Sequence, residues 1–217
     1  MKYKAVLFDL DGTLCDTTEG VYAAVQYSLE KTGHSPADDA LLKAFVGPPL
    51  TYTYTKLCGM TEEETERAII AFREFYADKG LYMSKPYEGM AELIMLLKKK
   101  GVRVGTATYK REDFAKSLLG SKFPEGCFDV IKGSDSACSI TKAQIVEAAI
   151  SELGADKSET VLIGDTHFDA EGAAAAGVGF IAVTYGCGFE NEHDAEGYPH
   201  VGVCGNTREI GALLDIL

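Results

Sequence analysis

The sequence predicts an α/β protein in which helices cover both faces of a mainly parallel sheet and a helical unit is inserted near the N-terminus. From Gly89 onward, strand-like and helix-like patterns alternate repeatedly, which is typical of parallel sheets. Between the first strand and that region the pattern stays helical for roughly seventy residues, far longer than an ordinary connection. We therefore expect a core domain formed by residues 1–15 and 87–217 and a helical domain formed by residues 16–86.

The first strand is expected at Ala5–Phe8, an apolar run typical of a strand buried on both faces. It stops at two carboxylates, Asp9 and Asp11, and Gly12 then lets the chain turn. Because alternate residues of an extended chain share a face, both carboxylates would point beyond the carboxyl end of the strand, where parallel sheets bind their ligands. Two like charges placed so closely favour a hard divalent cation between them.

The inserted unit is expected to contain four helices delimited by caps, glycines and prolines. They would span residues 17–33, 35–45, 50–58 and 61–80. Ser35-Pro36 would place a proline in the first turn of the second helix. In the third, the alternation of Thr and Tyr over residues 51–55 also resembles a strand. The capping box at Thr61 marks the clearest helix start, and residues 84–87 would return the chain to the core.

The core elements follow from apolar runs bounded by caps and glycines. Strands are expected at residues 102–107, 128–132, 160–163 and 180–183, and helices at residues 89–100, 111–119, 141–153, 169–176 and 207–216. In a parallel sheet of this kind, residues from the carboxyl ends of several strands can meet.

Composition and charge narrow the class of protein. The chain has 217 residues, of which 46% are hydrophobic, enough for a substantial core. Its net charge of −12 argues against a nucleic-acid partner bound through phosphates. The six cysteines include no Cys-x-x-Cys pair, and no apolar run of about 20 residues could span a membrane. The residues after Met1 have a strand pattern rather than that of a signal sequence, so we expect none. We therefore expect a cytoplasmic protein with no membrane partner.

Four segments at the ends of strands carry the polar side chains. They are Asp9 and Asp11, then Thr106 to Lys110, then Thr141-Lys142, and finally Asp165 to Asp169. Together they supply carboxylates, a hydroxyl and an ammonium. This set suits phosphoryl transfer, in which a metal and a fixed cation neutralise the phosphoryl oxygens while hydroxyl and backbone N–H groups hold them.

In order and spacing, these segments resemble the four motifs of the haloacid-dehalogenase-like (HAD) hydrolase superfamily. The residues that carry the resemblance are Asp9-Leu-Asp-Gly-Thr13, Thr108, Lys142 and Gly164-Asp165-x-x-x-Asp169. The inserted helices, with Phe45-Val-Gly-Pro-Pro-Leu50, resemble the cap of the phosphoglycolate phosphatase and β-phosphoglucomutase branch. The resemblance implies a doubly wound, Rossmann-like core that binds Mg²⁺, a mobile helical cap domain and a phospho-aspartyl intermediate.

The resemblance also implies roles for the acids. Asp9 would be the nucleophile, and Asp11 would be the general acid that protonates the leaving oxygen and later the base that activates water. Asp9, the backbone carbonyl of Asp11, and Asp165 would bind Mg²⁺. Asp169 would hold a metal-bound water or orient Lys142.

The phosphate-binding residues implied by the resemblance are Gly12, Thr108, Tyr109 and Lys142. Thr108 and Lys142 would hold the transferred phosphoryl group, and Gly12 would allow close approach of the backbone. Thr106 is an alternative to Thr108 as the hydroxyl of the second motif. Tyr109 stands where relatives usually have Ser or Asn, so the substrate contact at this position differs from the family pattern.

Three functions remain open at this point. The first is a Mg²⁺-dependent phosphatase for a small phosphorylated metabolite, acting as a monomer or homodimer. The second is a β-phosphoglucomutase-like phosphomutase, which the Lys142-Ala143 pair disfavours because mutases often have Lys followed by Pro there. The third is a phospho-aspartate signalling module without turnover, which the long helical insertion disfavours because a signalling receiver needs no substrate lid.

Overall fold

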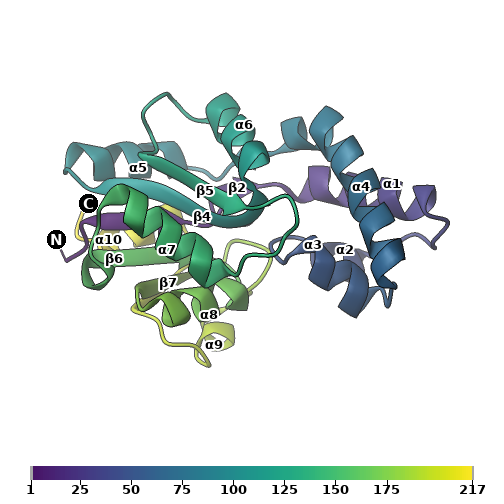
Figure 1. Cartoon of the computed structure of the whole chain (residues 1–217). Coiled ribbons are helices and arrows are strands. Elements are labelled where there is room, and N and C mark those ends of the chain that lie inside the picture. Colours follow the sequence, from purple (N-terminus) through teal and green to yellow (C-terminus); the bar gives the residue numbers. More distant parts are fainter. Residues whose placement is uncertain (1, 217) are drawn as a thin grey trace.

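A computed structural model of the chain describes residues 2–216 and contains a six-stranded sheet in which every neighbouring pair is parallel (Figure 1). The strand order is β5-β4-β1-β6-β7-β8. The strands are β1 (Ala5–Phe8), β4 (Arg103–Arg111), β5 (Val130–Ser134), β6 (Thr160–Gly164), β7 (Gly179–Val183) and β8 (Gly202–Cys204). The predicted α/β class and the mainly parallel sheet are confirmed.

Strand β1 lies at the centre of the sheet and is buried on both faces. Val6 and Phe8 belong to one hydrophobic cluster, whereas Ala5 and Leu7 belong to another, as expected because successive side chains of a strand alternate between faces. Its neighbours are β4 and β6, with Phe8 opposite Thr106 on one side and Ile163 on the other. This register brings the residues that follow these strands to one edge of the sheet.

Helices cover both faces of the sheet. On the Phe8 side lie α5 (Met90–Lys99), α6 (Glu112–Lys122) and α10 (Thr207–Leu213), and on the Leu7 side lie α7 (Lys142–Leu153), α8 (His167–Ala176) and α9 (Glu192–Ala195). The doubly wound arrangement predicted from the sequence is therefore present, and it places the helices that follow β5 and β6 against the same face.

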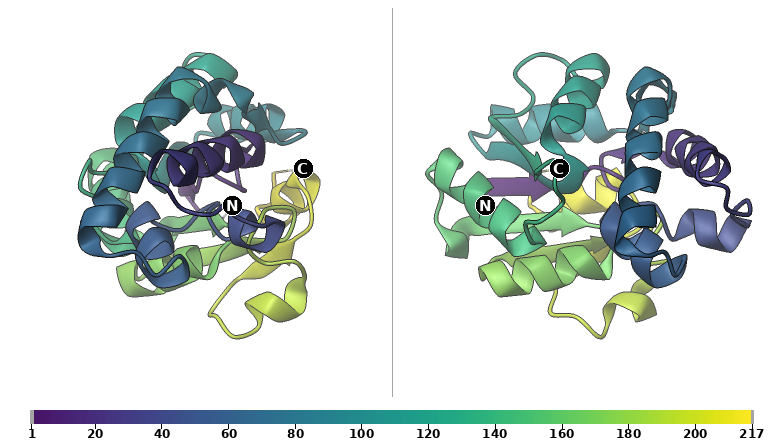
Figure 2. Two further views of the ribbon diagram at one scale, coloured as in Figure 1. Left: turned by 90° about the vertical axis from the view of Figure 1, so that its right-hand side faces the viewer. Right: turned by 45° about the vertical axis from the view of Figure 1, so that its right-hand side comes forward.

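The inserted helices lie beyond the carboxyl ends of the strands, as the views in Figures 1 and 2 show. They are α1 (Thr18–Lys31), α2 (Asp39–Lys43), α3 (Leu50–Tyr52), a π-helical turn (Thr53–Leu57), α4 (Glu62–Asp78) and a 3₁₀ turn (Gly80–Met83). We call this helical insertion the cap. The chain enters it through β2 (Cys15–Asp16) and leaves it through β3 (Lys85–Pro86), and these two short strands pair antiparallel.

Several boundaries differ from the sequence-based predictions. Helix α2 begins at Asp39, because the side chain of Asp38, rather than Ser35, accepts the capping hydrogen bond from Leu41 N–H; Pro36 is therefore outside the helix. Helix α8 begins at His167, two residues before the expected start, because Thr166 caps it. The segment is helical from residue 50 to residue 57, which excludes the strand alternative.

Other differences concern short elements at the edge of the sheet. Strand β8 has three residues and helix α9 has four, and neither was predicted. Strand β4 continues to Arg111 through a register shift after Ala107, so it is longer than expected. The last helix ends at Leu213 rather than Ile216.

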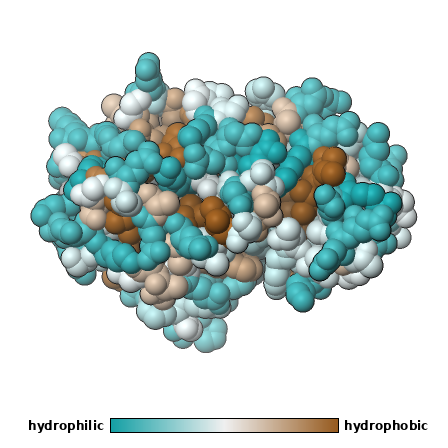
Figure 3. Space-filling model, viewed as in Figure 1, coloured by the Kyte–Doolittle hydropathy of each residue, from teal (hydrophilic) through white to brown (hydrophobic). Residues whose placement is uncertain are grey.

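The surface seen in Figure 3 is mostly hydrophilic, and its hydrophobic residues form separate small areas. Scattered apolar residues of this kind are normal on protein surfaces. Within residues 2–216, none of the helices is both long enough and apolar enough to cross a membrane.

The packing of the cap predicts a glycine requirement at Gly20. A Cβ on Gly20 would lie 2.1 Å from the carbonyl oxygen of Gly80, where α1 crosses the 3₁₀ turn. We expect Gly20→Ala to lower the free energy of unfolding by about 1–3 kcal/mol through overpacking. Gly120, in α6, has nothing within 4 Å of such a Cβ, so Gly120→Ala should be neutral or stabilise by up to about 1 kcal/mol. Urea denaturation measures both, and equal effects would contradict this account.

Candidate active site

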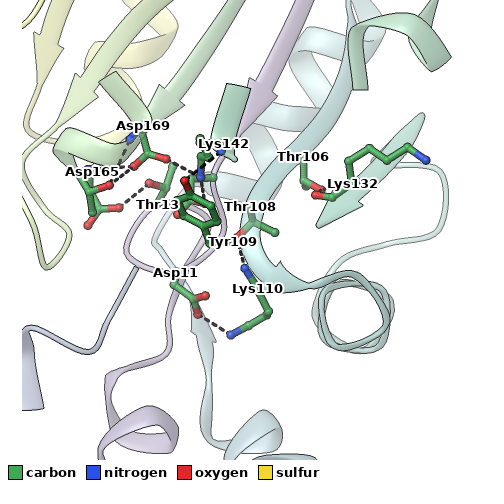
Figure 4. A network of polar contacts seen from close by, with 12 residues as sticks. Asp11, Thr13, Thr106, Thr108, Tyr109, Lys110, Lys132, Lys142, Asp165 and Asp169 are labelled. Carbon is green, nitrogen blue, oxygen red and sulfur yellow. Dashed lines mark hydrogen bonds and ion pairs between the residues drawn. The ribbon is translucent and has the colours of Figure 1, made fainter. Parts of the chain in front are cut away.

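The strand ends bring four segments of the chain together, as Figure 4 shows. Asp9 follows β1, and its N–H donates to Ile163 O at 2.8 Å, so the backbone of Asp9 is fixed to β6. Asp165 follows β6, Lys142 opens α7, and Thr108 lies in β4. The side chains of all four are buried. The sequence predicted this convergence from the rule that parallel strands end at a common edge.

Lys142 lies between two of the acids. Its Nζ is 2.6 Å from Asp9 Oδ1 and 2.6 Å from Asp169 Oδ1. Burial opposes the charge of this lysine, but the two carboxylates outweigh burial and raise the pKa of Lys142 above its usual value. Its stem passes α8 at Gly172, where a Cβ would lie 2.4 Å from Lys142 Cγ. Lys142 is therefore a fixed positive charge beside Asp9.

Tyr109 supports the backbone of Lys142. Its hydroxyl accepts a hydrogen bond from the Lys142 N–H at 3.0 Å, and its ring centroid is 5.3 Å from Lys142 Nζ. Thr141 caps α7 through a capping box with Gln144, so the first turn of the helix is fixed from both sides. The structure thus places Tyr109 next to the site, as the sequence predicted, while its contact with substrate stays a prediction.

Asp165 is held by three hydrogen bonds. Its Oδ1 accepts from Thr13 Oγ1 at 3.0 Å, and its Oδ2 accepts from the N–H groups of Cys187 at 2.9 Å and Gly188 at 3.1 Å. Burial and the nearby charge of Asp169 nevertheless raise the pKa of Asp165 to about 7. These fixed donors hold the carboxylate in one orientation even though it is repelled by its neighbour.

The acids form a cluster that fits a divalent cation. Single carboxylate oxygens of Asp9, Asp165 and Asp169 lie within 4.8 Å of one another, and all three side chains are buried. Burial and repulsion from the other carboxylates raise the pKa of Asp9 despite its contact with Lys142, so one lysine does not balance the three acids. An oxygen-rich, buried and negatively charged set of this kind is the type of ligand set that Mg²⁺ takes.

The side chain of Asp11 points away from that cluster. Its Oδ1 accepts from Thr17 Oγ1 at 2.5 Å and lies 2.8 Å from Lys110 Nζ. Lys110 in turn lies over the ring of Tyr76 in the cap, 4.5 Å from its centroid. The carboxylate of Asp11 is therefore directed toward the cap, and any role in metal binding belongs to its backbone carbonyl.

The two threonines of the second motif have different surroundings. Thr106 Oγ1 donates to Lys132 O and accepts from Lys132 N–H, both at 3.2 Å, so it is bound to β5. Thr108 Oγ1 accepts from Lys110 N–H at 3.1 Å and lies on the side of Lys142 and Asp11 (Figure 4). The geometry favours Thr108 as the hydroxyl of the site.

Gly12 has a positive φ of +81°, and a Cβ there would lie 2.3 Å from Asp165 Oδ2. Its N–H donates to Cys15 O at 2.9 Å. The close approach that this glycine permits in the structure is thus to Asp165, and its predicted contact with phosphate stays a prediction.

Sequence reasoning missed the residues that hold the acids in place. They are Thr13, Thr17 and Thr166, with the N–H groups of Cys187 and Gly188. Thr166 has a sequence signal, because Thr-x-x-Asp is close to the capping-box pattern. The two N–H donors have none, since every residue except proline carries such a group.

The mainly parallel α/β core, covered by helices, carries a buried aspartate, a lysine and an acidic cluster at its strand ends, which is an arrangement suited to phosphoryl transfer. The sequence matches the family described as haloacid dehalogenase-like hydrolase over residues 6–183. The chain therefore belongs to this enzyme family, as the sequence motifs predicted.

Curated relatives differ in the reactions that their names describe. A 5'-nucleotidase of Pseudomonas aeruginosa is 33% identical over 193 residues, which are 88% of this chain and 87% of the relative. The tyrosine-protein kinase PtkA of Mycobacterium tuberculosis is 33% identical over 184 residues, 84% of this chain but 62% of that protein. A phosphoglycolate phosphatase of Neisseria meningitidis is 30% identical over 192 residues, 85% and 82% of the two chains.

A solved structure resembles the entire chain. The crystal structure of a predicted phosphatase from Clostridium acetobutylicum superimposes with a TM-score of 0.93 at 32% identity, covering 99% of both chains. The similarity includes the inserted helices, because they lie within the covered part. The fold and the inserted helices therefore occur together in a structure described as a predicted phosphatase.

The raised pKa of Asp165 predicts a pH-dependent stability in chelator. Folding raises this pKa from 3.8 to about 7, so the folded protein keeps a proton that the unfolded chain releases, and stability falls as the pH rises from about 4 to about 7. Asp165→Asn removes this titration. As the pH rises through this range, the Tm of the native protein should therefore fall relative to that of the variant.

Added Mg²⁺ provides the second arm of this measurement. At pH 8 it should raise the Tm of the native protein and have little effect on Asp165→Asn, because a ligand stabilises only the state that binds it. A Tm difference that is constant with pH would contradict the assignment of the raised pKa to Asp165.

Proposed function

We propose that the protein is a Mg²⁺-dependent phosphatase that hydrolyses small phosphomonoesters through a phospho-aspartyl intermediate on Asp9. The observation that carries the proposal is the buried group formed by Asp9, Lys142, Asp169 and Asp165, in which Lys142 Nζ lies 2.6 Å from Asp9 Oδ1. A carboxylate held beside a fixed cation and at the edge of an acidic cluster is suited to attack phosphorus, because the positive charges neutralise the phosphoryl oxygens.

The reaction would occur in two half-reactions. In the first, a carboxylate oxygen of Asp9 attacks phosphorus, the bond from phosphorus to the leaving oxygen breaks, and Asp11 gives its proton to that oxygen. In the second, Asp11 takes a proton from water, the water oxygen attacks phosphorus, and the bond to Asp9 breaks. Inorganic phosphate leaves, and both aspartates return to their starting states.

Other residues would bind and neutralise the phosphoryl group. Lys142 and Thr108 would hold its oxygens from two sides of Asp9. Mg²⁺, held by the carboxylates of Asp9 and Asp165 and the carbonyl of Asp11 with Asp169 beside it, supplies positive charge when bound. The donors that fix Asp165 keep this ligand set in place without substrate.

The cap would exclude water and contact the leaving group. Asp11 lines a cavity between the core and the cap, together with Phe45 and Phe72 from the cap. As the proposed general acid, Asp11 would therefore face the leaving group. Apolar walls at this point keep bulk water from the intermediate once the cap is closed.

Phosphate release from a panel of phosphorylated metabolites, with Mg²⁺ and with EDTA, tests the proposal. Asp9→Asn should lower the rate by about 10³-fold or more while keeping the fold, since the amide has nearly the shape of the carboxylate. The matched control is Asp156→Asn, which makes the same change at an exposed residue outside the cap and should keep the native rate. Retained turnover in Asp9→Asn would exclude the nucleophile.

The same experiment separates the alternatives. Isomerisation of a sugar phosphate without phosphate release would indicate a phosphomutase. A phosphorylated protein that persists without turnover would indicate a signalling module. Mg²⁺-dependent phosphate release by the native protein and by the control variant, but not by Asp9→Asn, supports the phosphatase.

The two threonines give a second prediction. Thr108→Val should lower kcat/KM by about 10²-fold, the effect of removing one donor to the reacting group. Thr106→Val should change kcat/KM by less than about 3-fold and lower the free energy of unfolding by about 1–3 kcal/mol, because it leaves the Lys132 N–H without its acceptor. The opposite pattern would identify Thr106 as the hydroxyl of the site.

A further inference from the structure

The cavity beneath the cap has a volume of about 60 Å³ and adjoins the proposed general acid. Asp11, Tyr109 and Lys110 line it from the core, and Phe45, Phe72 and Arg73 line it from the cap. Its walls are therefore largely aromatic, with charged groups at separate points. The charged groups that are free to bind a ligand indicate which leaving groups fit the site.

Three cations line the cavity, and two of them have acidic partners. Lys110 Nζ lies 2.8 Å from Asp11 Oδ1. Arg111 binds Asp113 with two nitrogens, at 2.5 and 2.7 Å, and lies over the ring of Phe114. Both charges are already balanced.

Arg73 is the third cation, and it lacks an acidic partner within residues 2–216. Among the residues that the structure describes, the only hydrogen-bond partner of its guanidinium is Cys138, which lies 3.2 Å from Nη2 through its Sγ. Burial raises the pKa of the Cys138 thiol, so this thiol is neutral and is a weak acceptor. A half-buried guanidinium in contact with a neutral thiol gains a stronger partner if an anion enters the cavity.

Three other cationic side chains of the cap differ from Arg73. Lys43 pairs with Glu190 and is exposed, and Arg67 and Lys85 are exposed as well. Arg73 alone among these four combines partial burial with a place in the wall of the cavity. The sequence could not separate it from the rest.

We propose that Arg73 binds a second anionic group, carried by the leaving group of the substrate. The proposal rests on the phosphatase function above and names its substrate class: short compounds in which the departing oxygen belongs to a fragment that ends in a carboxylate or a phosphate. Without Arg73, the wall of the cavity offers that anion no unpaired cation, because Lys110 and Arg111 already have acidic partners. With Arg73, two parallel N–H donors match its oxygens.

The size of the cavity favours the same class. In the measure used for this cavity, the space open to the centre of a water-sized sphere, one water needs about 10–15 Å³. The cavity of about 60 Å³ therefore admits a fragment of a few non-hydrogen atoms. A nucleoside is too large for this space. It would have to extend past Arg73 into a separate groove, of about 480 Å³, between α4 and residues 136–138.

Two matched substrates test the proposal. Ethyl phosphate has the chain length of 2-phosphoglycolate but lacks its carboxylate. The native protein should hydrolyse 2-phosphoglycolate with a kcat/KM about 10²-fold higher, the discrimination typical of a site that binds a polar group. Arg73→Gln should remove most of this preference by lowering kcat/KM for 2-phosphoglycolate, mainly through KM, with less than about 3-fold change for ethyl phosphate.

Controls distinguish the role of Arg73 from a structural one. Arg67→Gln changes an exposed arginine of the same helix and should keep the native preference for 2-phosphoglycolate. Arg73→Lys keeps a positive charge and should retain part of the preference that Arg73→Gln loses. Unchanged hydrolysis of ethyl phosphate shows that Arg73→Gln is folded. Pyrophosphate, tested in parallel, shows whether the bound anion is a phosphate rather than a carboxylate.

The outcomes separate the two proposals. Equal kcat/KM for ethyl phosphate and both anionic substrates, an equal loss for all substrates in Arg73→Gln, or faster hydrolysis of a nucleoside 5'-monophosphate overturns the role of Arg73 and leaves the phosphatase intact. Absence of Mg²⁺-dependent phosphate release from every substrate overturns the phosphatase itself.

Discussion

The structure depends on keeping three carboxylates close together in a buried place. Asp9, Asp165 and Asp169 repel one another, and burial strengthens the repulsion because water no longer screens it. Lys142 and the hydrogen-bond donors around Asp165 offset part of this cost. The remaining negative charge is of the kind that a bound divalent cation balances.

Much of the fold and the site could be predicted because the informative signals are local. Ala5–Phe8 is apolar throughout, so its two buried faces could be read directly, and Asp9 and Asp165 follow strands that end at one edge. Lys142 was identified by its position after a capping residue and by the order of the motifs. In each case one short segment determines where its side chain lies.

The features that sequence reasoning missed depend on distant partners or on groups that every residue has. Strand β8 has three residues and needs β7 beside it to form. The N–H groups that bind Asp165 come from a loop whose conformation requires small residues, since a Cβ at Gly188 would lie 2.3 Å from Asp165 O. Arg73 is distinguished from other surface cations only by the cavity that the folded cap forms.

The pairing of β2 with β3 has a consequence for how such a protein can be divided. Cys15 lies opposite Pro86, so the chain leaves the core and returns to it at adjacent points. Topologically, the whole cap is one long loop whose ends are already joined. Its length adds little strain to the sheet, because closing a longer loop costs only slightly more entropy. The core can therefore keep its architecture while the segment between these two points is exchanged, lengthened or replaced by a short turn.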